Sequence, residues 1–293
     1  MKEGDRSLKV SIIIVNWNGG EDILECLKSV KDIDYPDYEI IAVDNGSTDN
    51  SVKEIKGAFP DIKLILNDKN LGFPAGVNVG IKAATGGYIL LLNDDTVVAR
   101  NILKDLVEAM ESDPGIGIAG PMILYYSEPD KIWSAGMQLH LLGYASHIGK
   151  GLNKELFNKS YPVDYMTGCV VLIKKEVIDK IGLLDPEYFL YSEDADFCLR
   201  ARNAGYRCMY VPSPTVWHKA TKEWITNPAQ AYYYMRSAIV FAKKNLTGLK
   251  KVIFIASQFL LVFPYNSLRV IKKGDSRLIK YLLKGLKDGI AYH

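Results

Sequence analysis

The first 120 residues alternate short apolar runs with segments in which apolar residues recur every three or four positions. Runs of the first kind are typical of strands, and segments of the second kind are typical of helices. The strand-like runs are 10–15, 39–43, 62–66, 88–92 and 116–119, and the helical segments are 22–30, 50–58, 75–84 and 101–111. Strand–helix alternation predicts an α/β fold with a mostly parallel, Rossmann-like sheet flanked by helices. The near-continuous apolar strands predict that both faces of this sheet are buried.

The pattern changes after residue 120. Residues 121–168 are rich in Gly, Tyr and Ser and support no assignment. Beyond them the spacing predicts strands at 169–173 and 207–211 and helices at 174–181, 194–204, 230–245 and 250–273. We therefore expect one domain at 1–227, with halves at 1–120 and 121–227, followed by a helical extension at 228–293.

Charge is distributed unevenly. Hydrophobic residues make up 48% of the chain and charged residues 24%, which is the balance of a globular protein. The net charge is +2, but residues 243–293 carry eleven Lys or Arg against two acids, so the other 242 residues sum to −7. Basic amphipathic helices of this kind can lie on an anionic membrane, and 243–287 is the candidate segment. A face packed on the domain or an oligomer contact is the alternative, and no motif supports nucleic-acid binding.

The expected cellular compartment follows from the absence of spanning and signal segments in the sequence. No segment reaches the roughly 18 consecutive apolar residues of a spanning helix. The nearest, 252–264, is interrupted by Ser257 and Gln258 and suits a buried or an interfacial helix. The N-terminus has no signal-peptide pattern, so we expect a cytoplasmic protein, peripheral on the membrane face if the basic helices bind lipid. The four cysteines form no C-x-x-C pair and suit reduced core positions.

Polar residues follow three of the predicted strands directly: Asn16, Asp44 and the run 93–95 (Asn-Asp-Asp). The carboxyl ends of parallel strands are where such sheets bind ligands. The loop from Asp44 to Asp49 suits an Asx turn or helix cap, and Asp44 can also accept hydrogen bonds from a base or ribose. Two adjacent carboxylates repel each other, so 94–95 favours a Mg²⁺ or Mn²⁺ site over a simple cap for the helix near Asn101.

A second acidic cluster, 192–196 (Ser-Glu-Asp-Ala-Asp), opens a predicted helix. Acids at a helix N-terminus are commonly capping residues. Here three acids follow an aromatic run, and crowding raises carboxyl pKa values in the way a general base requires. His218 follows a Pro-rich turn, and we expect it to have a functional role only if the fold brings it near Asp95.

Two nucleotide-binding patterns are missing. The small-residue segment 70–78 (NLGFPAGVN) would let backbone approach a ligand, but it is no P-loop. The turn after the first strand, 16–20, does not give G-x-G-x-x-G, which removes the main support for a dinucleotide-binding fold.

Taken in order, these segments resemble the inverting glycosyltransferases of family 2, which have the GT-A fold, and among them the rhamnosyltransferase-like branch. The resemblance covers about residues 10–219. Its motifs are SIIIVNWNG, VDNGSTDNS, NLGFPAGVNVGI, ILLLNDDT, TGCVVLIKKEV, GLLDPEYFLYSEDADFCLRARNAGY and VWH. A processive synthase of the family would need spanning helices and a Q-x-x-R-W motif, and neither is present.

The resemblance implies a role for each matching residue. The nucleotide-binding residues would be Val15, Trp17, Asp44, Asn70, Gly72, Asn78 and Asp94. Asp95 and His218 would hold Mn²⁺ or Mg²⁺, and Asp194 would be the catalytic base with Glu193 beside it. The family's Asp-x-Asp stands here as 93–95 (Asn-Asp-Asp), so the first acid is absent and only the last is expected to be a ligand.

The implied reaction is a single displacement with inversion, in which an acceptor hydroxyl attacks the sugar of a nucleotide-diphosphate donor. UDP- or dTDP-sugars are the expected donors, and a glycan or lipid-linked sugar is the expected acceptor, in cell-surface polysaccharide or glycolipid assembly. The rivals are an inactive nucleotide- or carbohydrate-binding module and a sugar-nucleotide nucleotidyltransferase. The latter should carry a Gly-rich loop ending in Arg after the first strand, which 16–22 lacks.

Overall fold

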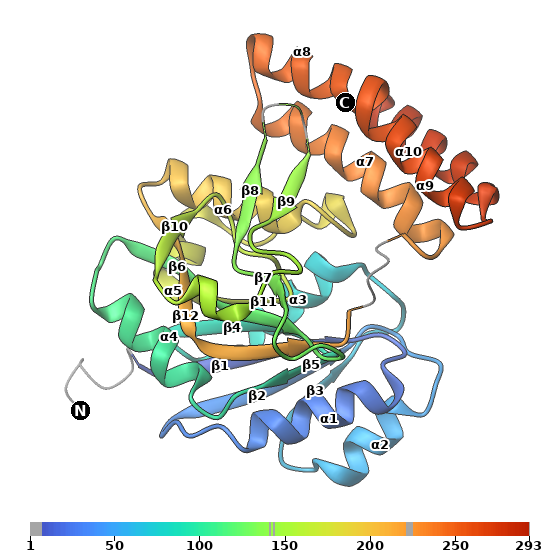
Figure 1. Ribbon diagram of the computed structural model, residues 1–293. Coiled ribbons are helices and arrows are strands. Elements are labelled where there is room, and N and C mark those ends of the chain that lie inside the picture. Colours follow the sequence, from blue (N-terminus) through green and yellow to red (C-terminus); the bar gives the residue numbers. More distant parts are fainter. Residues whose placement is uncertain (1–7, 141, 143, 221–224, 293) are drawn as a thin grey trace.

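A ten-stranded sheet, covered by helices on both faces, dominates the fold (Figure 1). The computed structural model describes residues 8–140, 142, 144–220 and 225–292. Within this part of the chain the strands of the sheet are β1 (Val10–Asn16), β2 (Tyr38–Asp44), β3 (Lys63–Leu66), β4 (Tyr88–Asn93), β5 (Thr96–Val98), β6 (Ile116–Tyr125), β7 (Ile132–Ser134), β10 (Tyr161–Val163), β11 (Val170–Lys174) and β12 (Arg207–His218). A separate hairpin consists of β8 (Met137–Leu139) and β9 (Ala145–His147).

The sheet has the order β10-β12-β6-β11-β4-β1-β2-β3, with β5 paired to β12 and β7 to β6. β1 pairs in parallel with β2 and β4, β2 with β3, and β6 with β12. β11 is antiparallel to both of its neighbours, β4 and β6. The predicted mostly parallel, Rossmann-like sheet is confirmed.

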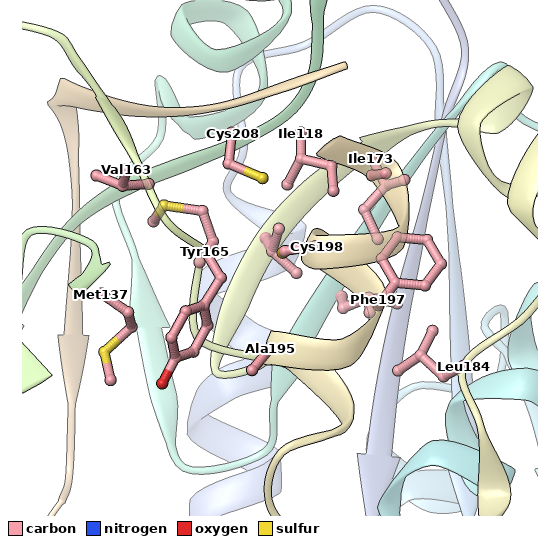
Figure 2. Packing of buried hydrophobic residues seen from close by; sticks show 14 of the residues in the cluster. Ile118, Met137, Val163, Tyr165, Ile173, Leu184, Ala195, Phe197, Cys198 and Cys208 are labelled. Carbon is pink, nitrogen blue, oxygen red and sulfur yellow. The ribbon is translucent and has the colours of Figure 1, made fainter. Parts of the chain in front are cut away.

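Alternating strand residues divide the core into two layers, because successive side chains point to opposite faces of a sheet. The helices over the sheet are α1 (Gly20–Lys31), α2 (Ser51–Ala58), α3 (Phe73–Ala83), α4 (Ile102–Glu111), α5 (Lys175–Ile181) and α6 (Glu193–Asn203). Ile12 and Ile14 of β1 pack with residues of α1, α2 and α4, whereas Ile13 and Val15 pack with α3, α5 and α6. Figure 2 shows the second layer, in which Ala195, Phe197 and Cys198 of α6 lie among buried residues of the sheet.

All four cysteines are buried and free, as the sequence predicts. Three short 3₁₀ turns, η1 (Lys154–Phe157), η2 (Pro186–Tyr188) and η4 (Ser276–Leu278), connect the larger elements.

The predicted short strand at 207–211 ends too early. β12 continues to His218, so His218 ends a strand and does not follow a turn. Pro212 and Pro214 suggest a turn because proline lacks the N–H that a strand ladder uses. The structure accommodates both prolines at an irregularity in the pairing of β12 with β6, between Tyr210 and Thr215.

The C-terminal extension contains α7 (Pro228–Asn245), α8 (Gly248–Ser257), a π-helical segment η3 (Gln258–Val262), α9 (Phe263–Lys272) and α10 (Ile279–Ala291). The sequence indicated two helices here, and α10 was missed. Gly285 and Gly289 weaken its helical signal because glycine is a poor helix former. In the structure they let α10 approach α7 closely, since a Cβ on Gly285 would lie 2.2 Å from the Tyr232 carbonyl oxygen.

By length and composition, one stretch of the described residues, Gly248–Lys272, could cross a membrane. The sequence rule of consecutive apolar residues selected only its middle part, 252–264, as the nearest candidate and interpreted it as a buried or an interfacial helix. About a fifth of its most apolar window (22%) is buried in the protein. The expected cytoplasmic location stays a prediction.

Candidate active site

The carboxyl ends of β4, β1 and β2 place the predicted polar residues side by side. In the pairing register, Asn16 at the end of β1 stands opposite Asp44 at the end of β2. Val15 stands opposite Asn93 on the other side, immediately before Asp94 and Asp95. The topology therefore brings together three segments that are far apart in the sequence, as expected at the ligand-binding edge of such a sheet.

His218 lies beside Asp95, although 123 residues separate them in the chain. Its Nε2 is 3.2 Å from the Asp95 carboxylate, and the next residue, Lys219, donates its backbone N–H to the Asp95 carbonyl oxygen at 2.9 Å. The pairing of β12 with β5 produces this contact, because His218 stands opposite Thr96 in that ladder. The condition that the sequence set for His218 is met.

Trp133 and His147 support the His218 ring, and sequence reasoning missed both because they lie in the unassigned segment. The Trp133 ring meets His218 edge-on at 4.4 Å between centroids and packs on His147 at 4.3 Å. Aromatic contacts of this kind fix the orientation of a buried imidazole. His218 itself is buried.

The carboxylates of Asp94 and Asp95 differ in charge state. Burial, followed by the charge of Asp95, raises the pKa of Asp94 to about 7. Burial also acts to raise the pKa of Asp95, but the hydrogen bond and charge of His218 outweigh it and hold that pKa below its usual range. Asp95 is therefore the ionised member of the pair at neutral pH.

The Asp95–His218 pair fits a divalent cation. Among the described residues, Asp95 Oδ1 is a buried atom without a hydrogen-bond partner, and it lies 3.2 Å from His218 Nε2. A carboxylate oxygen and an imidazole nitrogen are ligands that Mn²⁺ accepts, and a hard cation at such sites commonly completes its shell with substrate phosphates and water. Across the residues that the structure describes, no group of three or more His, Cys, Asp or Glu could hold a metal ion. The simple capping alternative fails, because β5 separates Asp95 from α4 and Asn101 occupies the N-cap position.

The first two strands supply a buried polar anchor and an exposed aromatic ring. Asp44 accepts from the Asn16 side chain at 2.7 Å and from the backbone N–H groups of Gly46 and Ser47 at 3.2 and 3.0 Å. The predicted turn at this loop is thus present, and Asp44 fixes its shape. The Trp17 ring is 55% exposed beside it, while Val15 is buried.

Asn45, which sequence reasoning did not select, joins this loop to the 70–78 segment. Its side chain donates to Asn70 Oδ1 and to the Gly72 carbonyl oxygen, each at 3.1 Å, and accepts from the Leu71 N–H. Gly72 has φ +84°, and a Cβ there would lie 2.7 Å from the Phe189 ring. Only glycine suits that close approach.

Asn78 has structural contacts. Its amide donates to the Leu184 carbonyl oxygen at 2.7 Å and its oxygen accepts from the Leu184 N–H at 3.1 Å. These two hydrogen bonds attach α3 to the segment before η2. Asn78 is buried, so a part in nucleotide binding would be through the position of α3.

Glu193 and Asp194 of the second acidic cluster lie at the start of α6, where Glu193 is buried and Asp194 is half-buried. Asp194 accepts from the Gly168 N–H at 3.1 Å and from the Ala195 N–H at 2.7 Å, whereas Glu193 Oε2 has no hydrogen-bond partner among the described residues. Burial and the neighbouring Asp194 raise the pKa of Glu193 to about 8, and burial raises the pKa of Asp194. The expected rise in carboxyl pKa is present at both residues.

The third acid, Asp196, has a structural environment. It accepts from Arg200 at 2.8 Å, from the Tyr188 hydroxyl at 3.1 Å and from Asn245 of α7 at 2.8 Å. The cluster of three therefore divides into a partnered acid and a pair whose charge is poorly compensated.

The loop before the pair is strained. Phe189, Tyr191 and Ser192 have φ of +61°, +67° and +69°, a region that residues other than glycine rarely adopt. Strain of this kind persists where the surroundings hold it and is concentrated at functional sites. Nothing in the sequence signals it.

A short run of backbone connects the two acidic clusters. Gly168 donates to Asp194, and the next residue, Cys169, accepts from the Asn93 N–H at 2.9 Å. The carboxylates at the end of β4 and those at the start of α6 are therefore held by one rigid element. The arrangement offers an ionised carboxylate with an imidazole on one side and a proton-sharing carboxyl pair on the other.

An α/β sheet with acidic groups at its carboxyl edge and a second carboxyl pair beside it is the architecture of the GT-A glycosyltransferases. The model of the family "Glycosyl transferase family 2" matches residues 11–182. The chain belongs to this family and is a glycosyltransferase.

Relatives and solved structures agree with this assignment. An N-acetylglucosaminyl-diphospho-decaprenol L-rhamnosyltransferase of Mycobacterium tuberculosis is 24% identical over 243 residues, covering 74% of this chain and 78% of the relative. The structure of GalNAc-T7 with UDP, GalNAc and Mn²⁺ has a TM-score of 0.65 and 20% identity, over 80% of this chain and 48% of that one, so the chain spans about half its length. S. aureus TarS 1-349 has a TM-score of 0.62 and 17% identity, over 96% of this chain and 80% of that one.

Proposed function

We propose that this glycosyltransferase moves a sugar from a UDP- or dTDP-sugar to an acceptor hydroxyl with inversion, and that a divalent cation assists. The observation that carries the proposal is the contact of His218 with Asp95 at the carboxyl end of β4. Likeness to the mycobacterial rhamnosyltransferase supports a lipid-linked sugar as acceptor and a place in cell-surface polysaccharide or glycolipid assembly.

The donor nucleotide would bind over the ends of β1 and β2. Trp17 offers an exposed ring on which a base can stack, with Val15 beneath it and Asp44 at the rim. Asn70 and Gly72 would bring backbone close to the nucleotide as part of the loop that Asn45 holds. Asp94 would meet the ribose or the donor sugar.

Asp95 and His218 would hold Mn²⁺ or Mg²⁺. The cation, when bound, supplies positive charge that stabilises the leaving diphosphate. This chain orients the site: β5 and β12 fix the distance between the two side chains, and Trp133 fixes the His218 ring.

Asp194 is the proposed base. The pair of buried carboxyls cannot easily carry two charges, and the pKa of Glu193 is raised to about 8, so Glu193 retains the proton at neutral pH. The N–H groups of Gly168 and Ala195 favour the ionised form of Asp194. Asp194 can then accept the proton of the acceptor hydroxyl as the new bond forms.

We also propose the division of labour expected from the sequence. Residues 1–120 would bind the nucleotide, residues 121–227 would form the acceptor side with the base, and residues 228–293 would form an extension outside the catalytic domain. The contact of Asn245 with Asp196 supports a fixed position for that extension.

The test is calorimetric titration of UDP and dTDP, with and without Mn²⁺, on wild type and Asp95→Ala. Metal-dependent binding that is lost in the variant is the expected result. Asp130→Ala is the matched control, since Asp130 is exposed and pairs with Lys154 on the surface. If wild type binds none of UDP, dTDP, GDP and CDP, the proposal is overturned in favour of an inactive module of the same fold.

A further inference from the structure

The outer side of α8, η3 and α9 presents a continuous apolar surface, here called the outer face. Every exposed residue between positions 252 and 271 is apolar or a tyrosine. These residues are Val252, Ile253, Ala256, Phe259, Leu260, Leu261, Pro264, Tyr265, Leu268 and Ile271. Leu260 is 73% exposed, as is Leu249 one turn before the run. A surface of this size on a protein is typically an interaction site.

The π-helical segment keeps this face continuous. At 100° per residue, an unbroken α-helix would place the exposed residues of α9 about a quarter of a turn away from those of α8. The i→i+5 turn of η3 includes one extra residue and offsets this difference. The exposed residues of both helices thus fall on one side, and π segments of this kind are frequent at functional sites.

The opposite side of the same helices is packed on the protein. Phe254, Val262 and Val270 are buried there, and Val262 and Val270 share a core with α7 and α10 residues. The buried side also carries the polar residues Ser257, Gln258 and Asn266. These would contact lipid if the helix crossed a bilayer by itself, which is unfavourable.

The charged residues at the two ends of the outer face are mostly basic, although Asp275 follows Lys273 and pairs with Arg277. Lys250 and Lys251 precede it and Lys272 and Lys273 follow it, while Arg269 is the sole charged residue from position 252 to 271. Lys280, Lys284 and Lys287 of α10 are exposed as well. An apolar strip with lysines at both ends matches the interface of an anionic bilayer, where acyl chains take the strip and phosphates take the lysines.

We propose that the outer face docks in the plane of an anionic lipid bilayer. α8, η3 and α9 lie along the surface with their outer residues among the acyl chains, and α7 and α10 remain on the aqueous side. A second copy of the chain is the rival occupant, but two such faces would bring the lysines of both copies together.

Docking in this way also orients the acceptor side of the site, a consequence that rests on the proposed function. Tyr234 of α7 makes an edge contact with Tyr191 at 6.1 Å, two residues before Glu193. Arg269 and Tyr265 of α9 are near enough to act on the pKa of Tyr234. Tyr191 and Tyr234 thus connect the carboxyl pair with the side of α7 that faces α9, and a lipid-linked acceptor could approach the pair from this side.

The experiment is flotation of the full chain with vesicles of phosphatidylcholine alone or mixed with phosphatidylglycerol. We expect binding to the mixed vesicles that weakens with added salt, and release by alkaline carbonate. Leu249→Glu/Leu260→Glu should reduce partitioning by about tenfold or more, because each leucine loses its burial in lipid. Leu156→Glu is the matched control, since Leu156 is 69% exposed on η1, away from this face.

The charge contribution is tested with Lys250→Gln/Lys251→Gln/Lys272→Gln against Lys53→Gln/Lys56→Gln/Lys104→Gln, which removes the same charge from α2 and α4. Only the first set should weaken binding to the mixed vesicles. In-plane docking would be overturned by any of three results: wild type does not bind the mixed vesicles, the leucine double variant binds them as well as wild type does, or alkaline carbonate fails to release the bound protein. A lipid-free dimer that the leucine variant abolishes, without vesicle binding, would assign the face to self-association. Calorimetry of UDP without vesicles reports separately on the donor site.

Discussion

The two acidic clusters contain the same kind of side chain but differ in the groups that contact them. The imidazole of His218 holds the pKa of Asp95 below its usual range. Glu193 has no cationic neighbour within hydrogen-bond distance in the part of the chain that the structure describes, and its pKa is raised to about 8. Both carboxyls lie next to a second acid, and desolvation acts to raise both pKa values, so these two effects do not explain the difference. The partner explains the difference: the hydrogen bond with His218 favours the charged form of Asp95, whereas Glu193 lacks such a partner and retains its proton. One cluster is thus suited to bind positive charge and the other to exchange a proton.

The first prediction removes the ionised carboxylate. Asp95→Ala should lower activity by about 10⁴-fold, since metal-ion stabilisation of a leaving group contributes several kcal/mol. Steady-state transfer assays with a range of Mn²⁺ concentrations measure the effect. Asp95→Asn retains the shape without the charge and should be nearly as inactive. Full activity of either variant would remove the distinction between the clusters.

The second prediction removes the proposed base. Asp194→Asn should reduce kcat by about 10³-fold, within the usual range for general-base catalysis, and leave the affinity for UDP unchanged. Calorimetry and single-turnover transfer measure these two quantities. Asp196→Asn is the matched control for charge, because Asp196 has structural partners; its kcat should change far less than that of Asp194→Asn at equal folded fraction. A shift of UDP affinity in Asp194→Asn would place this residue at the donor site.

The third prediction concerns the raised pKa of Glu193. The folded protein retains a proton that the unfolded chain releases above its ordinary pKa of 4.5, so stability falls as pH rises from about 4.5 to about 8. Between about pH 6 and pH 8 the decline from this group should be about 2 kcal/mol. Glu193→Gln should lose that part of the slope, and urea unfolding at several pH values measures it. Parallel curves for the two proteins would show that Glu193 is ionised when folded.

The sequence predicts the positions and partners of the two clusters to different extents. The run 93–95 follows an apolar strand directly, and the periodicity that defines the strand also places its end, so the edge position of Asp94 and Asp95 was predictable. His218 was proposed for the metal site from resemblance alone, because its proximity to Asp95 depends on the β12–β5 pairing. No local pattern encodes a contact across 123 residues.

For the second cluster, the sequence predicted only that several acids lie close together. Its division, with Asp196 bound by Arg200 and Asn245, depends on contacts from α6 and α7, and the strained loop at 189–192 leaves no trace in composition. The same holds for Trp133 and Asn45, which act by packing and by linking loops. Strands and amphipathic helices are local patterns, whereas the residues that hold a site in shape are selected by the tertiary fold.

The last prediction sharpens the assignment of the first cluster to the donor side, and its effect is the smallest. The backbone N–H of Trp17 hydrogen-bonds to Asp94, so the ring stands beside the ionised cluster and far along the chain from the second one. Trp17→Ala should weaken UDP binding by about tenfold, since stacking of a base on an aromatic side chain contributes about 1–3 kcal/mol. Trp17→Phe keeps a ring and should lose less. Because the ring would contact the base and not the reacting atoms, kcat at saturating donor should be unchanged. A fall in kcat with unchanged UDP affinity would instead place Trp17 on the acceptor side, and the two clusters would then share one substrate.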